Sequence, residues 1–184
     1  MESDQDSADV RNVLGGNKAA FENIVRRWQN PLINLAFRFC RDRQRAEDMA
    51  QDAFLHIYRQ LNKYRGDAAF STWIFSVSLN LYRSMLRRKT MIVESLDDLA
   101  EIAGNHFSDS QIEQHEREEL VRKAVTVLPP RYRDAIIIYY FRDKNLTEAA
   151  EILGVPEGTV KAWLHRGRDL LRRKLGGDRK EAQI

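Results

Sequence analysis

Apolar side chains recur with the period of an α-helix along most of the chain. Over residues 18–28 they fall on one face, and Pro31 can open a second helix whose apolar stripe runs to Cys40. The clearest stripe occupies 46–61 and follows the i, i+3, i+4 rule for about four turns. A fourth helix begins after the turn-like stretch RGDAAF, with Ser71 or Thr72 as its cap, and runs to about Arg88. No segment shows the period of a strand, so this part of the chain is predicted to form a helical bundle.

An acidic segment divides the chain. Residues 91–119 hold nine acidic side chains and one basic one, Arg117, and they lack a sustained apolar face. Helical periodicity then resumes, is interrupted at Pro129-Pro130, and ends in one long helix. The sequence therefore predicts an all-α protein of two small helical domains joined by a flexible linker. Its parts are an acidic N-terminal tail (1–17), a first domain (18–90), the acidic linker (91–117), a second domain (118–176) and a C-terminal tail (177–184).

The linker's acidity has two interpretations. The negative charge can keep the linker off DNA, or it can let the linker enter a basic channel as a mimic of nucleic acid.

The segment LTEAAEILGVPEGTVKAWLHRGRDLL has the spacing of a helix-turn-helix. Ala150 is small where two helices must approach closely, Gly154 stands where a helix-ending turn needs a positive φ, and Val160 returns to the core. Thr147 can cap the first helix, and Pro156 stands near the start of the second. A basic hairpin with no ligand could share some of these features, but the spacing and caps together favour DNA binding.

The last helix is predicted to divide into a core side and a basic side. At 100° per residue, the side that points to the core holds Val160, Leu164, Gly167, Leu171 and Leu175, and Trp163 flanks it. The N-terminal part of such a helix enters the major groove, where Arg can pair with guanine and a methyl group can meet thymine. The candidates for reading base edges are Lys161, Ala162, His165 and Arg166. Arg168 and the basic residues after it suit phosphate contacts, and Asp169 should repel phosphate.

The third helix carries acid on its outer face, with Leu55 exposed among polar residues. Acid near a helix N-terminus compensates the helix dipole, which explains part of the pattern. A docking face for a basic partner helix would explain Leu55 as well. From the residues alone, both interpretations stay open.

One stripe of the fourth helix combines rings, amides, hydroxyls and guanidinium groups and ends in Arg87-Arg88-Lys89. Such groups hold unstacked nucleotides, because rings stack on bases, amides bond base edges and cations meet phosphates. The preceding loop adds Phe70 beside Gly66. The alternative is that Phe70 and Trp73 are core residues and that the basic cluster is a solvated helix end.

Composition excludes several classes of protein. No apolar run approaches the 18 residues of a membrane span, and the N-terminus lacks the apolar region of a signal peptide. The single cysteine, Cys40, rules out an internal disulfide and fits core packing. The four histidines have no metal-ligand spacing, and phosphate-binding and nucleophile motifs are missing. We therefore expect a cytoplasmic protein that is not an enzyme and has no cofactor or metal.

Two segments in this order resemble one protein family. AEDMAQDAFLHIYRQLNKYRGDAAFSTWIFSVSLNLYRSMLRRK (46–89) resembles region 2 of bacterial sigma-70-family sigma factors, and LPPRYRDAIIIYYFRDKNLTEAAEILGVPEGTVKAWLHRGRDLLRRKL (128–175) resembles region 4. With little between them, the chain resembles the short extracytoplasmic-function (ECF) group over roughly residues 18–176. The resemblance implies a factor that binds core RNA polymerase, directs it to promoters and helps to melt DNA.

The resemblance also implies roles for particular residues. Docking on the clamp helices of the polymerase β′ subunit would involve Asp48, Gln51, Asp52 and Leu55. Recognition and melting of the −10 element would involve Arg65, Asp67, Phe70, Ser71, Trp73, Asn80, Arg83, Arg87, Arg88 and Lys89. Recognition of the −35 element would involve Thr159, Lys161, Ala162, His165, Arg166 and Arg168. Region 4 would also dock on the β flap, and an anti-sigma factor, in some cases membrane-bound, would hold the protein inactive.

The recognition helix departs from the common family pattern TVKSRLHRAR. Here it is TVKAWLHRGR, so Ala162 replaces a hydrogen-bonding Ser and Trp163 replaces an Arg. The alternative function is a dimeric helix-turn-helix repressor or activator that binds operators on its own. That class would show a ligand pocket or a dimerising heptad, and neither is evident in the sequence.

Overall fold

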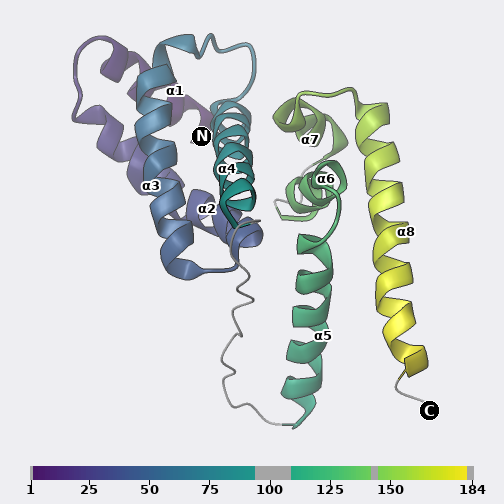
Figure 1. The fold of residues 1–184 in the computed structure, drawn as a ribbon. Helices are drawn as coiled ribbons and strands as arrows, with labels where there is room; N and C mark the ends of the chain where they lie inside the picture. Colours follow the sequence, from purple (N-terminus) through teal and green to yellow (C-terminus); the bar gives the residue numbers. More distant parts are fainter. Residues whose placement is uncertain (1, 94–108, 142–144, 182–184) are drawn as a thin grey trace. The chain divides into compact units, whose positions relative to one another are not determined.

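The computed structural model describes the backbone of residues 2–93, 109–141 and 145–181, and it is helical throughout its secondary structure in those ranges (Figure 1). The chain divides into two compact units, Met1–Leu96 and Asp97–Ile184. The first holds α1 (Glu2–Leu14), α2 (Ala20–Cys40), α3 (Arg43–Gln60), the short 3₁₀ helix η1 (Leu61–Lys63) and α4 (Phe70–Val93). The second holds α5 (Asp109–Thr126), α6 (Pro130–Phe141), α7 (Leu146–Leu153) and α8 (Glu157–Glu181). The all-α prediction is confirmed.

The core of the first unit lies where α2, α3 and α4 meet. The fully buried side chains include Leu35 of α2, Ile57 of α3 and Phe75 of α4. Each such side chain stabilises the fold by roughly 1.5–3 kcal/mol relative to exposure. Tyr82 is buried as well, and its hydroxyl donates to the Leu32 carbonyl at 3.3 Å. Burial raises the pKa of Tyr82.

One prediction for this unit is wrong: Pro31 does not open a separate helix but lies inside α2. A proline there removes one backbone hydrogen bond of the helix. The helix continues because Ile24 and Trp28 before the proline and Leu32 and Leu35 after it are buried in the same core.

The N-terminal residues also differ from the prediction, since most of the expected tail is helix α1. Val10 and Val13 are buried, and so are the carboxylates of Asp6 and Asp9. These four residues share one helix face, but the acids hide the apolar pattern from a sequence analysis. Both acids pair with Arg27 of α2, the Nε–Oδ1 distance to Asp6 being 3.0 Å. A buried carboxylate needs such a partner.

The charges of this network stabilise one another. Burial by itself would raise the pKa of Asp9, but hydrogen bonds from Arg27 and Asn23 hold it below its usual range. Partial burial opposes the charge of Arg27, yet its bonds to Asp9 and Asp6 raise its pKa. The helix α1 is therefore fixed to α2 by paired charges, in addition to the burial of its two valines.

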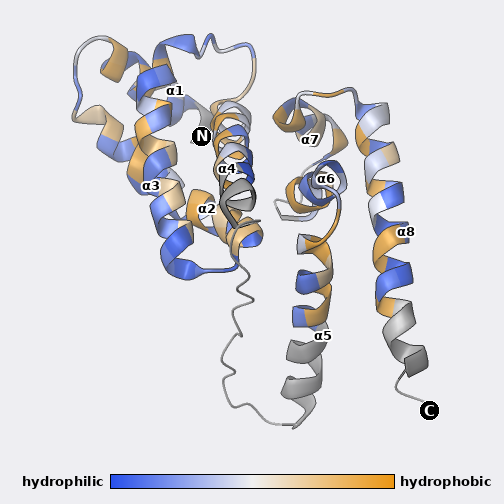
Figure 2. Ribbon diagram, viewed as in Figure 1, coloured by the Kyte–Doolittle hydropathy of each residue, from blue (hydrophilic) through white to orange (hydrophobic). Residues whose placement is uncertain are grey.

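The second unit is built around α6, which contacts α5, α7 and α8. Ala135, Ile136, Ile137 and Ile138 are all buried, as expected for a central helix. Along α8, hydrophobic and hydrophilic stretches alternate, as its two-sided sequence requires (Figure 2). No helix in the described ranges is both long and apolar enough to cross a membrane.

Two boundaries differ from the predicted ones. Helix α5 begins at Asp109, inside the expected linker 91–117, and α8 continues to Glu181, inside the expected tail 177–184. Both stretches are rich in Glu, Gln, Lys and Arg, which favour a helix without an apolar face. The remainder of the expected linker, from 94 to 108, lies outside the described residues.

Candidate promoter and polymerase interfaces

The turn between α7 and α8 has the geometry of a helix-turn-helix. Gly154 ends α7 with φ 69°, and its N–H donates to the carbonyls of Ala150 and Glu151. A side chain other than glycine would be strained at this φ. The predicted cap is displaced: Asn145, not Thr147, caps α7 and accepts from the Glu148 N–H at 2.9 Å. Thr147 lies within the first turn, where its hydroxyl donates to Glu157 across the turn at 2.6 Å.

The core side of α8 packs closely on α6. Val160, Leu164 and Gly167 are buried, as the helical count predicts, and Trp163 is half-buried beside them. A Cβ atom at Gly167 would lie 2.8 Å from Cδ1 of Ile136. The glycine therefore lets the two helices approach. The side chain of Ile136 leaves no room for a larger residue at position 167 of the HRGR segment.

The outward side of α8 exposes Lys161, Ala162, His165, Arg166 and Arg168, and Thr159 is half-buried at the start of the helix. The N-terminal half of this surface therefore presents cations, an imidazole and a methyl group together, without covering side chains. This arrangement can meet the edges of base pairs and the adjacent phosphates.

Four contacts constrain the side chains of this surface. Asp169 lies 2.9 Å from Nη1 of Arg172 and 3.2 Å from Nδ1 of His165. The expected repulsion of phosphate by Asp169 is thus offset by a charge of the same helix. Arg168 donates to the Tyr140 hydroxyl at 3.5 Å. A hydrogen bond from Arg166 lowers the pKa of Tyr132 of α6, and the charges of Arg131 and Arg166 lower it further.

The predicted −10 residues lie around the loop Tyr64–Ala69 (the 64–69 loop) and along α4. Gly66 has φ 82°, and the Tyr64 hydroxyl donates to the Ala68 carbonyl at 3.0 Å, which closes the loop on itself. Arg65 and Asp67 are exposed in this loop, and Ser71 is half-buried just after it.

The aromatic residues differ from the prediction in one case. Phe70 is only 1% exposed, so its ring cannot stack on a base and is a core residue. It packs between Tyr64, at 5.3 Å between ring centroids, and Trp28, at 6.4 Å. Trp73 is half-buried against Tyr64 and Phe70 and keeps part of its surface accessible. The sequence does not distinguish Phe70 from Trp73, because either aromatic ring can pack in a core or stack on a base.

The polar stripe of α4 lies beyond these rings. Asn80 is exposed, and its Oδ1 accepts from Nη1 of Arg83 at 3.2 Å. Arg87 is exposed in the same helix. The side chains of Arg88 and Lys89 lie outside those that the structure describes.

The outer face of α3 exposes Asp48, Gln51, Asp52 and Leu55, and Leu55 is 53% exposed. The structure weakens the interpretation that these acidic residues serve to compensate the dipole of α3. Asp42 already caps α3, accepting from the Arg45 N–H at 2.8 Å. Asp48 and Asp52 stand in later turns, and the dipole acts mainly on the first one.

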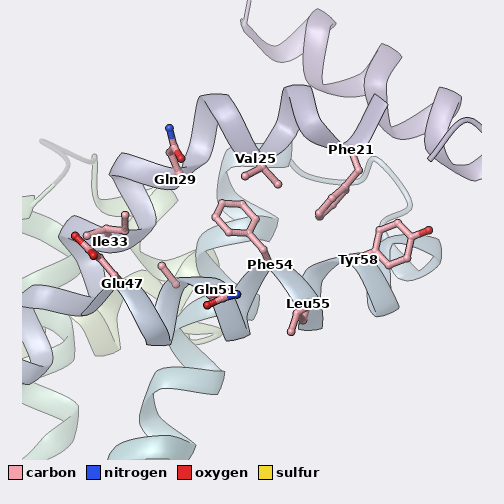
Figure 3. A pocket seen from close by; sticks show the side chains of 10 residues that line it. Phe21, Val25, Gln29, Ile33, Glu47, Gln51, Phe54, Leu55 and Tyr58 are labelled. Carbon is pink, nitrogen blue, oxygen red and sulfur yellow. The ribbon is translucent and has the colours of Figure 1, made fainter. Parts of the chain in front are cut away.

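An apolar groove adjoins this face, between α2 and α3, with a volume of about 430 Å³ (Figure 3). Phe21 forms its end, with its ring at 5.0 Å from that of Tyr58. Leu55 and Gln51 belong both to the groove and to the outer face of α3. The groove was not predicted from the sequence, because the apolar residues of 18–28, Phe21 and Val25 among them, were placed on a single helix face. The sequence feature that indicates the groove is the width of the apolar stripe of α2, which covers more of the helix surface than one packed face needs.

The described side chains show no group of three His, Cys or acidic residues that could hold a metal ion.

Comparison with known proteins identifies both units. The model of Sigma-70 region 2 matches residues 24–91, and that of Sigma-70, region 4 matches residues 118–171. The RNA polymerase sigma-H factor of Pseudomonas aeruginosa is 31% identical over 95% of this chain and 96% of its own. The ECF RNA polymerase sigma factor SigW of Bacillus subtilis is 30% identical over 90% of this chain and 94% of its own.

Solved structures show the same fold. CnrH in complex with the cytosolic domain of CnrY matches with a TM-score of 0.68 at 23% identity, covering 95% of this chain and 99% of that chain. RpoE in complex with the anti-sigma factor NepR from Bartonella quintana matches with a TM-score of 0.64 at 21% identity, covering 85% of this chain and 96% of that chain. Two family regions in this order, in a chain that ECF factors match nearly from end to end, show that the protein belongs to the sigma-70 family of RNA polymerase sigma factors, in its ECF group.

Proposed function

We propose that this sigma factor directs core RNA polymerase to promoters through two separate DNA contacts, α8 on the −35 element and the α4 surface on the −10 element. The observation that carries the proposal is the division of α8. Its core side is closely packed on α6, while its outward side exposes cations at the end that a helix-turn-helix inserts into the major groove.

At the −35 element, Lys161 and Arg166 are the proposed readers of base edges, since both are exposed and can donate to guanine. His165 and Arg168 suit neighbouring bases or phosphates, Thr159 suits a phosphate near the start of the helix, and Ala162 suits a thymine methyl. The half-buried Trp163 supports the helix rather than reading DNA.

At the −10 element, the proposed contacts come from the 64–69 loop and the polar stripe of α4. Arg65, Asp67 and Ser71 surround the place for an unpaired base, with Trp73 as the ring able to stack on it. Asn80 and Arg83 suit base edges and the backbone, and Arg87 with Arg88 and Lys89 suits phosphates. Phe70 supports the loop from within the core.

For docking on the β′ clamp helices, we propose the α3 face of Asp48, Gln51, Asp52 and Leu55 together with the groove beside it. The acidic residues suit a basic partner helix, and the groove suits one apolar side chain of that helix. The second unit would dock on the β flap.

In this function the protein carries no catalytic residue of its own, and it acts in the cytoplasm, where polymerase and DNA are. We further propose control by an anti-sigma factor. The support is that the neighbour RpoE is solved in complex with the anti-sigma factor NepR.

Transcription with purified core polymerase tests the proposal. Candidate promoters come from transcripts that rise when the protein is overproduced. We expect initiation at these promoters with core enzyme plus this protein, and none with core enzyme by itself. Tight binding of the free protein to palindromic operators, without any stimulation of core enzyme, would contradict the proposal and favour a dimeric repressor.

A further inference from the structure

Helix α1 is joined to the 64–69 loop through one carboxylate. Oδ1 of Asp6 accepts two hydrogen bonds, from Nε of Arg27 at 3.0 Å and from the indole Nε1 of Trp28 at 3.1 Å. Asp6 and Trp28 are both buried, at 2% and 5% exposure. A buried indole N–H requires an acceptor, so Asp6 determines how the Trp28 ring is held.

Trp28 in turn packs against aromatic rings of α4, one of which directly follows the loop. Its ring meets Phe75 edge-on at 5.7 Å and Phe70 at 6.4 Å. Phe70 packs on Tyr64, whose hydroxyl bonds to the carbonyl of Ala68 within the loop. The rings therefore form a continuous path from α1 to both ends of the loop.

Helix α1 also lies next to the elements on either side of the loop. Helix α1 contacts η1 and α4, the two elements that flank the loop. Burial raises the pKa of Tyr64, and the negative charge of Asp6 raises it further. Arg27 balances the charge of Asp6.

We propose that Asp6 is a positioning residue for −10 recognition: it orients Trp28 and thereby holds the 64–69 loop in the shape that receives an unpaired base. The inference rests on the proposed function of the loop. Helix α1 would thus contribute to promoter recognition without contacting DNA itself. Preorganising the loop would remove the cost of ordering it when the strand binds.

Asp9 provides a matched control, because it belongs to the same helix and the same network. It accepts from Arg27 and Asn23, so Asp9→Ala removes a carboxylate from Arg27 while leaving the Asp6–Trp28 bond. Asp6→Asn is the conservative variant, since its amide oxygen can still accept from Trp28.

The first measurement is amide hydrogen exchange of the 64–69 loop in the free full-length protein. We expect exchange about tenfold faster in Asp6→Ala, because the buried Trp28 N–H loses its charged acceptor, and within about twofold of wild type in Asp9→Ala and Asp6→Asn. Equal acceleration in Asp6→Ala and Asp9→Ala, or no rescue by Asp6→Asn, would overturn the proposal. If Asp6→Ala does not fold, Trp28→Phe, which removes the N–H donor, takes its place.

The second measurement is binding of a single-stranded −10 oligonucleotide, from a promoter mapped as above, to polymerase carrying each variant. We expect about tenfold weaker binding for Asp6→Ala alone, with core affinity and −35 duplex binding unchanged. If wild-type polymerase complex does not bind this strand, the proposed function fails. If wild type binds and Asp6→Ala matches Asp9→Ala, only the role of Asp6 fails.

Discussion

The two units separate packing and recognition in different ways. In α8 the packed side chains and the exposed side chains proposed for recognition lie on different sides of one helix, so the helical count predicted which are buried and which are exposed. Around the 64–69 loop the same kinds of residue serve both roles, and Phe70 proved to be core while Trp73 kept an accessible edge. Along α8 the angle per residue separates packed from exposed positions, whereas in the first turn of α4 Phe70 and Trp73 are separated by which ring the core has room for. Recognition in the first unit should therefore be more sensitive to mutations in the core.

The largest expected effect is that of Phe70→Ala. Removing a buried phenylalanine should lower the free energy of unfolding of the first unit by about 3–5 kcal/mol. Chemical denaturation of the full chain measures this loss, with Trp73→Ala as the half-buried control that costs less. Wild-type stability combined with lost −10 binding would mean that Phe70 leaves the core to contact DNA.

Arg166→Ala should affect recognition without affecting the fold. We expect a loss of about 1–3 kcal/mol of discrimination between −35 sequences, because a guanidinium that pairs with a base is removed from an exposed position. Binding of the polymerase complex to −35 duplex variants at several salt concentrations measures it. Arg172→Ala is the control and should change only the salt dependence. Uniform weakening on all sequences by Arg166→Ala would contradict base reading.

Leu55→Ala tests whether the outer face of α3 serves binding without contributing to the packing of the first unit. We expect about tenfold weaker binding to core polymerase, equivalent to about 1.4 kcal/mol, because an exposed apolar side chain at the edge of the groove is lost. Stability should change little. Leu14→Ala is a matched control, since Leu14 is 51% exposed on α1. Equal effects of the two variants on core binding would exclude a specific role for Leu55.

The smallest effect concerns the packed side of α8. Gly167→Ala gains helix propensity, about 1 kcal/mol, but its Cβ meets Ile136 and overpacking costs about 1–3 kcal/mol. We expect a net loss of about 1 kcal/mol in thermal unfolding. The double variant Gly167→Ala with Ile136→Val removes the colliding Cδ1 and should regain that loss. A stabilised single variant would show that Ile136 moves aside freely.

Much of this architecture was predictable from sequence. The 3.6-residue period gave the helical class and the core side of α3, and the spacing Ala150, Gly154, Val160 gave the helix-turn-helix with its left-handed turn. These features depend on local geometry: the angle per residue and the φ that only glycine adopts easily. The outward positions of Lys161, Arg166, Asp48 and Leu55 follow from the same geometry.

Tertiary contacts decided the rest. Only the packed structure showed that Asp6 and Asp9 are buried, because a carboxylate belongs in a core only when a distant partner, here Arg27, neutralises it. Only packing showed that α2 continues through Pro31, that Phe70 is internal, and that Phe21 and Tyr58 leave a groove open between α2 and α3. A sequence specifies what each residue can do within its own helix. Which of those possibilities is realised depends on the neighbours that the fold supplies from elsewhere in the chain.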